Sequence, residues 1–73
     1  MLVSVIRQDV EILEREYENA IKANFDDDDD IFLPIKNFGM CRIKKSQCAD
    51  VIYKANRELD KGKFFTLIKI DPY

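Results

Sequence analysis

Carboxylates are the side chains of this chain whose number and spacing could do chemistry. Five aspartates follow one another without a break, and five more acids precede them within the first 30 residues. Such groups could bind divalent cations, act as general acids and bases, or imitate the phosphates of a nucleic acid. The candidate partner-binding acids are Asp9, Glu11, Glu14, Glu16, Glu18, Asp26, Asp27, Asp28, Asp29 and Asp30.

These acids divide the chain into two halves of opposite charge. Residues 1–30 carry ten acidic against three basic residues, a net charge of −7, whereas residues 31–73 carry nine basic against four acidic residues, a net charge of +5. The whole-chain charge of −2 and the pI near 5.0 argue against a simple nucleic-acid binder, although a local patch can override the net charge.

Metal binding and catalysis are both disfavoured by the pattern. The aspartates alternate like the opening of an EF-hand, but the sixth position is Ile31 instead of Gly and the twelfth is Asn37 instead of Glu. The chain has no histidine, no P-loop, no GxSxG and no HEXXH. We therefore expect a non-enzymatic protein without a metal or a cofactor. Cys41 and Cys48 are too few for a disulfide scaffold, and we expect both to be reduced and semi-buried.

The acids must be positioned by the elements around them. Apolar residues recur at steps of three and four from Val3 to Ala20, which predicts an acidic amphipathic helix over residues 4–24 with Ser4 as its N-cap. Residues 1–6 could instead form a short strand. The stripe also fits three heptads, but like charges would face each other in a coiled-coil dimer, so we expect it to pack on the protein's own sheet.

The rest of the chain predicts a basic ββαβ part over residues 31–73, reached through an Asp-rich solvated linker over residues 25–30. Strands are expected at 31–36, 40–45 and 63–70, and a helix at about 47–60 with Ser46 as N-cap and Gly62 as C′ residue. The predicted fold is a single α+β domain, residues 1–73, of order α-β-β-α-β. Its three-stranded, mainly antiparallel sheet carries both helices on one face.

The open face of that sheet is a second candidate surface. Aromatic and basic side chains alternate along the expected strands, and such a face can stack on and neutralise single-stranded nucleic acid. The same apolar content could instead be a homodimer interface. The expected face includes Met40 and Leu67, and its candidate binding residues are Phe32, Lys36, Arg42, Lys44, Phe65 and Lys69.

Taken together, the sequence predicts a small interaction module, an inhibitor or regulator that binds a basic, nucleic-acid-handling protein by imitating nucleic acid with its acidic surface. The alternative is a nucleic-acid-binding regulator that uses the basic and aromatic sheet face. In its size and charge segregation the chain is similar in type to short proteins of phages and mobile elements. No apolar run approaches the length of a membrane span, so we expect a cytoplasmic protein, in the host cytoplasm if it is viral.

Overall fold

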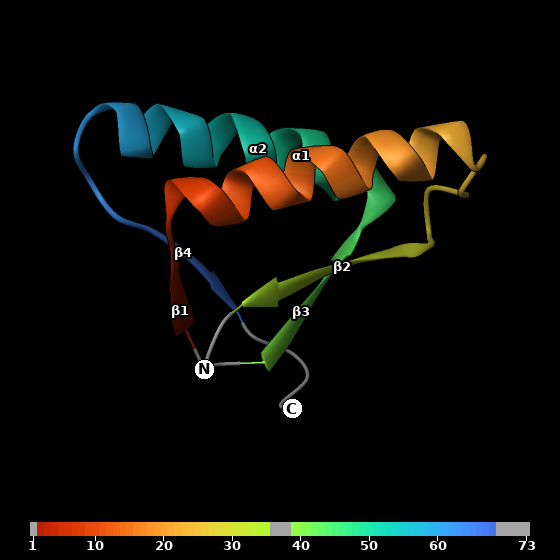
Figure 1. Ribbon diagram of the computed structural model, residues 1–73, viewed down its shortest axis with the longest axis horizontal. Coiled ribbons are helices and arrows are strands. Elements are labelled where there is room, and N and C mark those ends of the chain that lie inside the picture. Colours follow the sequence, from red (N-terminus) through yellow and green to blue (C-terminus); the bar gives the residue numbers. More distant parts are fainter. Residues whose placement is uncertain (1, 36–38, 69–73) are drawn as a thin grey trace.

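The computed structural model describes residues 2–35 and 39–68 of the chain. Strand β1 pairs antiparallel with β4, and β2 pairs antiparallel with β3 (Figure 1). The α+β class is confirmed. The predicted single three-stranded sheet is wrong, because the described strands form two separate two-stranded sheets. The order of the elements along the chain is β-α-β-β-α-β. In chain order the elements are β1 (Leu2–Val5), α1 (Arg7–Lys22), β2 (Asp30–Ile35), β3 (Gly39–Lys44), α2 (Lys45–Asp60) and β4 (Phe65–Ile68).

The N-terminal boundary of the first helix corrects the prediction of a helix from residue 4. Leu2–Val5 is a strand whose register sets Val5 opposite Phe65, so Ser4 lies in the strand and does not cap the helix. The helix starts after Ile6, whose N–H donates to the Asp9 carboxylate at 3.0 Å. That bond satisfies one of the donors that a helix start leaves free, which favours the turn at this point.

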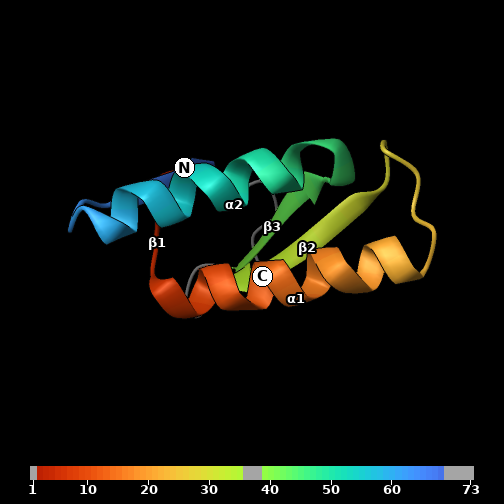
Figure 2. The ribbon, with the colours of Figure 1, turned by 90° about the horizontal axis from the view of Figure 1, so that it is seen from above.

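The two helices run antiparallel, side by side, on the same side of the strands (Figures 1 and 2). The apolar stripe of α1 is buried as expected, with Val10 and Leu13 almost wholly inaccessible. The prediction that this stripe packs on the protein's own strands is confirmed, since Leu13 and Ala20 lie in one cluster with the buried residues of β2. One core cluster contains Leu13, Ala20, Ile31, Leu33, Ile35, Cys41, Ile43 and Cys48, and a second contains Val5, Val10 and Ala55. Ile52 and Leu67 pack against both clusters and join them.

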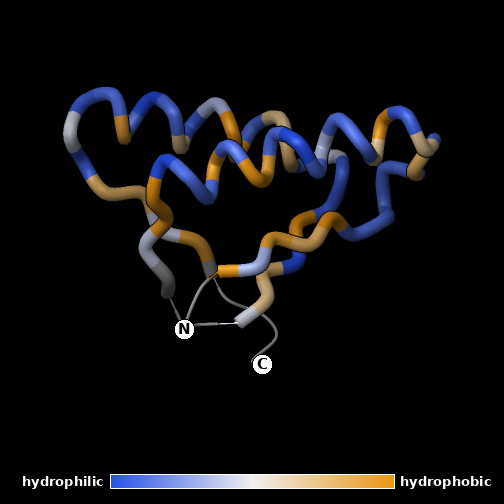
Figure 3. Tube along the Cα trace, in the orientation of Figure 1, coloured by the Kyte–Doolittle hydropathy of each residue, from blue (hydrophilic) through white to orange (hydrophobic). Residues whose placement is uncertain are grey.

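Strands β2 and β3 alternate between the core and the outside, as the sequence predicts. Ile31, Leu33 and Ile35 are buried, while the residues between them point outward. In Figure 3, both helices alternate along the chain between hydrophilic and hydrophobic residues, as amphipathic helices do. Helix α2 begins at Lys45 directly after β3, two residues earlier than expected and without Ser46 as its N-cap. The predicted last strand over residues 63–70 is confirmed over Phe65–Ile68 only. Its start was wrong, because Lys63 and Phe64 precede the strand and Lys63 N–H donates to the Glu58 carbonyl at the end of α2; residues from 69 lie outside the described residues.

Both helices end in the same way. At the end of α1, Asn24 takes a positive φ of 58° and donates its N–H to the Ile21 carbonyl, while Phe25 N–H donates to the Ala20 carbonyl. At the end of α2, Gly62 has a φ of 76° and the equivalent two bonds are present. These are Schellman motifs, which satisfy the free carbonyls of a last turn and fold the chain back over the helix. Gly62 as C′ residue is confirmed.

Within the described residues, neither helix has both the length and the apolar character needed to cross a membrane.

Candidate interaction surfaces

The aspartate run is a hydrogen-bonded loop rather than a free linker. Asp29 N–H donates to the Asp26 carbonyl at 3.0 Å, and Asp26 N–H donates to the Asp29 carboxylate at 2.8 Å. One aspartate side chain therefore serves the loop itself, because a short acceptor can bond to the backbone of its own turn. The side chains of residues 26–29 are exposed, and Asp30 opens β2.

The same loop covers the N-terminal end of α2. Lys45 N–H donates to the Asp29 carbonyl at 2.9 Å, and Ser46 N–H donates to the Asp27 carbonyl at 3.2 Å. The Lys44 ammonium lies 3.5 Å from the Asp28 carbonyl oxygen, and the Lys45 ammonium donates to the carbonyl of Phe25. Since a helix N-terminus is the positive end of its dipole, it also favours the nearby carboxylates. The loop, which we call the Asp loop (residues 25–30), is fixed by these contacts.

The exposed face of α1 is not uniformly acidic. Helical spacing places Glu11, Glu14 and Glu18 on one outer stripe, but Arg7, Arg15 and Lys22 fall on the same stripe. We call these six residues the outer stripe of α1. Glu18 pairs with Lys22 at 3.4 Å, and Glu14 accepts a hydrogen bond from Asn56 of α2 at 3.4 Å. With three acids and three basic residues, the stripe carries no net charge.

Two predicted helix acids lie apart from this stripe. Asp9 is buried, with 8% of its surface exposed, and its carboxylate bonds to the start of α1. Glu16 is half-buried on the side of α1 that faces β2. The ten acids predicted as one surface are therefore divided among a helix cap, the outer stripe, Glu16 and the Asp loop.

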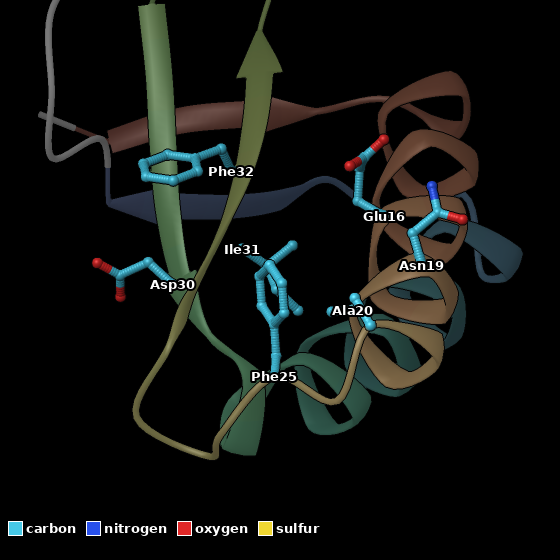
Figure 4. A pocket seen from close by; sticks show the side chains of 8 residues that line it. Glu16, Asn19, Ala20, Phe25, Asp30, Ile31 and Phe32 are labelled. Carbon is cyan, nitrogen blue, oxygen red and sulfur yellow. The ribbon is translucent and has the colours of Figure 1, made fainter.

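A hollow of about 250 Å³ lies between the C-terminal half of α1, the Asp loop and β2. The Schellman motif at Asn24 brings Phe25 back toward Ala20, and Figure 4 shows both beside Ile31 on the helix side of the strand. Asp30 and Phe32 point to the other side of β2 (Figure 4). This hollow was not predicted from the sequence. The helix-ending Asn24 followed by an aromatic was its available signal.

The remaining lining residues are polar or small. Among the described residues, the lining contains two carboxylates, from Glu16 and Asp30, and no cationic side chain. The Glu16 side chain makes no hydrogen bond or ion pair to a described residue, whereas Asp30 lies 4.0 Å from the Arg42 guanidinium. The hollow therefore combines an apolar floor with an acidic rim.

The outer face of β2 and β3 carries part of the predicted basic and aromatic surface. Phe32 is 49% exposed and lies directly opposite Arg42 in the register, with Lys44 on the same face. Met40, half-buried, is also on it. Phe65 and Leu67 instead pack against the core, so their expected place on this face is wrong. Lys36 and Lys69 lie outside the described residues. Arg42 lies 4.0 Å from the Asp30 carboxylate, which reduces the positive charge that Arg42 contributes to this face, whereas the Lys44 ammonium contacts a backbone carbonyl of the Asp loop.

The cysteines and the acids form no reactive or metal-binding group in the described part of the chain. Cys41 and Cys48 are not joined in a disulfide, and both are fully buried where the sequence predicted semi-buried side chains. Burial raises the pKa of Cys48 to about 11. A thiol with a raised pKa is a poor nucleophile at neutral pH. Across residues 2–35 and 39–68, no three His, Cys, Asp or Glu side chains are arranged to hold a metal ion.

Comparisons with protein-family models, with curated proteins and with solved structures found no match.

Proposed function

We propose that this protein is a non-enzymatic interaction module, an inhibitor or regulator that binds a basic protein surface through the Asp loop and the acidic rim next to it. The observation that supports the proposal is that the Asp loop holds four consecutive exposed aspartates on a hydrogen-bonded backbone. Closely spaced negative charges resemble those of a nucleic-acid backbone, so the preferred partner is a protein that handles nucleic acid.

The fixed backbone of the loop is central to this proposal. A free run of aspartates would lose conformational freedom on binding, and that loss would oppose association. Here the two bonds to the N-terminal turn of α2 already restrict the loop in the unbound protein. Complementary charges on such a surface increase the rate of encounter and fix the orientation of the partner. The outer stripe of α1 contributes little, because its acids are compensated by its own cations.

The test is capture of a partner with tagged protein from a nuclease-treated lysate of the cells in which the protein occurs. The Asp27→Asn/Asp28→Asn double variant removes two charges whose carboxylates make no hydrogen bond to a described residue, so its fold should be unchanged. The matched control, Glu11→Gln/Asp50→Asn, removes two exposed charges elsewhere.

We expect a basic nucleic-acid-handling protein to be captured by the wild type and the control, with affinity for the loop variant reduced on the order of tenfold. Duplex DNA or RNA should compete with the captured protein. Equal capture by the loop variant and the wild type would contradict the proposal.

A second candidate function is nucleic-acid binding by the outer face of β2 and β3. The observation that favours it is the exposed Phe32 ring opposite Arg42, because an aromatic beside a guanidinium can stack on an unpaired base. This alternative predicts binding of single-stranded oligonucleotides that weakens steeply with salt and is lost in Arg42→Ala. Absence of any gel shift at low salt would exclude it.

A further inference from the structure

From the hollow beside β2 we infer a specific mode of recognition: an extended basic segment of a partner protein adds a strand to the free edge of β2 and places one apolar side chain in the hollow. This inference rests on the proposed function and adds to it the chemistry of the recognised segment. The observations that carry it are the position of the hollow at the strand edge, the orientation imposed by Pro34, and the acidic rim.

The hollow meets β2 at its edge and not at one of its faces. Successive side chains of a strand point to opposite faces, yet three consecutive residues, Asp30, Ile31 and Phe32, line this hollow. Only the edge of a strand presents consecutive residues to one space. Strand β2 pairs with β3 along one edge, and no strand in the described part of the chain pairs with the other.

Pro34 indicates which backbone groups the free edge offers. Proline has no N–H, so in the antiparallel register it fits the position whose N–H side faces away from the partner strand. Along an antiparallel strand, the backbone N–H and C=O groups of successive residues point alternately toward and away from the partner strand. Phe32 and Asp30, two and four residues before Pro34, therefore point theirs in the same direction as Pro34. Their N–H and C=O groups therefore face the free edge beside the hollow, where an extended peptide can bond to them.

The size and charge of the hollow define the segment. At about 250 Å³ the hollow lies below the range of roughly 300–1,000 Å³ that is usual for cofactor and small-molecule sites, and so suits a side chain. Its apolar floor of Ala20, Phe25 and Ile31 fits a leucine-sized group. The residues of an added strand that alternate with it would point toward Asp30 and the exposed Phe32 ring, and Glu16 lies at the rim. Lysine or arginine fits these surroundings through ion pairs and cation–π contact.

The experiment uses the whole protein and two short fluorescein-labelled peptides of equal charge, one alternating lysine with leucine and one alternating lysine with serine. Fluorescence anisotropy should show the leucine peptide binding tighter on the order of tenfold or more, because only leucine buries apolar surface in the hollow. In ¹H–¹⁵N spectra, the amide signals of Phe32 and Asp30 should move downfield with the leucine peptide, as new hydrogen bonds form.

Two charge-reversal variants on the same helix complete the test. Glu16→Lys places a cation at the rim and should weaken the leucine peptide several-fold. Glu11→Lys makes the same change on the outer stripe and should not. Equal affinity of the two peptides, equal effects of the two variants, or unmoved Phe32 and Asp30 signals would each overturn the inference.

Failure here is distinguishable from failure of the proposed function. Equal binding of both peptides would overturn the use of the hollow and leave the acidic surface in place. Absence of binding by either peptide would overturn the segment inference alone, since the proposed function is judged by partner capture with the Asp loop variant.

Discussion

The Asp loop and the outer stripe of α1 are both rich in acids in the sequence, but they differ in what they present. The stripe holds three glutamates among three cations at helical spacing, and two of those glutamates contact Lys22 or Asn56. The loop holds its aspartates together, and its contacts with lysine go to backbone carbonyls, so the exposed carboxylates of residues 26–29 form no ion pair with a described residue. The number of acids in a segment therefore predicts a charged surface only when the periodicity of the element is taken into account.

The largest expected effect separates the inner face of α1 from its exposed positions. Leu13→Ala removes a side chain that is 2% exposed, which costs about 2–5 kcal/mol of unfolding free energy. A domain of this size has only ~3–5 kcal/mol in total, so the variant should be largely unfolded by circular dichroism and urea titration. Ile21→Ala, on the same helix but 49% exposed, should lose less than about 1 kcal/mol. Similar losses in the two variants would show that the stripe does not pack as described.

A smaller difference in stability is expected between Asp29, whose carboxylate bonds to the loop backbone, and Asp28, whose side chain is only exposed. Asp29→Ala removes the acceptor of the Asp26 N–H bond and a charge near the start of α2, so it should cost about 1 kcal/mol of stability. Asp28→Ala removes an exposed side chain and should change stability by less than about 0.5 kcal/mol. Urea denaturation measures both. If Asp28→Ala costs as much as Asp29→Ala, the loop is not held by the Asp29 carboxylate.

The smallest effect concerns the outer stripe itself. Arg7 bonds to Asp60 at 2.6 Å and to Asn56, and so ties the start of α1 to the end of α2, but its side chain is 44% exposed. Solvent screening limits the loss in Arg7→Ala to about 0.5–1 kcal/mol, and salt should reduce it further. Arg15→Ala, on the same stripe and with no bond to a described residue, should be neutral in thermal melts at low salt. A larger loss in Arg15→Ala than in Arg7→Ala would contradict the described contacts.

The sequence correctly predicted those elements that depend on residues close together in the chain. The body of α1, the alternation of β2 and β3, and the end of α2 at Gly62 all follow from side-chain spacing and helix-ending residues. A helix was preferred to a strand over Leu2–Val5 because Val3 and Ile6 extend the helical spacing of apolar residues. Four residues are too few to distinguish the helical period of 3.6 from the strand period of 2. Its pairing is decided by Phe65–Ile68, at the other end of the chain. Phe65 was placed on the wrong face because that prediction assumed one continuous sheet.

The sequence predicted which acids form the candidate site, but it did not predict how their backbone is held. The aspartates were predicted to form a surface. Their hydrogen bonds to the start of α2, however, use backbone carbonyls, which every residue has and which the sequence therefore cannot indicate. The prediction of Ser46 as N-cap was wrong for this reason. The backbone N–H groups at the start of α2 donate to the carbonyls of Asp27 and Asp29 instead of to a side chain. The hollow depends on where Phe25 lies relative to Ile31, which only tertiary packing sets.

The bonds from the Asp loop to the first residues of α2 have a consequence for local opening. The first backbone amides of a helix ordinarily exchange their hydrogens with solvent quickly, because they have no intrahelical acceptor. The Lys45 and Ser46 amides are bonded to the carbonyls of Asp29 and Asp27, one step beyond the last strand pair, Asp30 with Lys44. Their hydrogens should therefore exchange as slowly as those of the β2–β3 ladder, so that the acidic loop, the strand pair and the helix start open together as one cooperative unit.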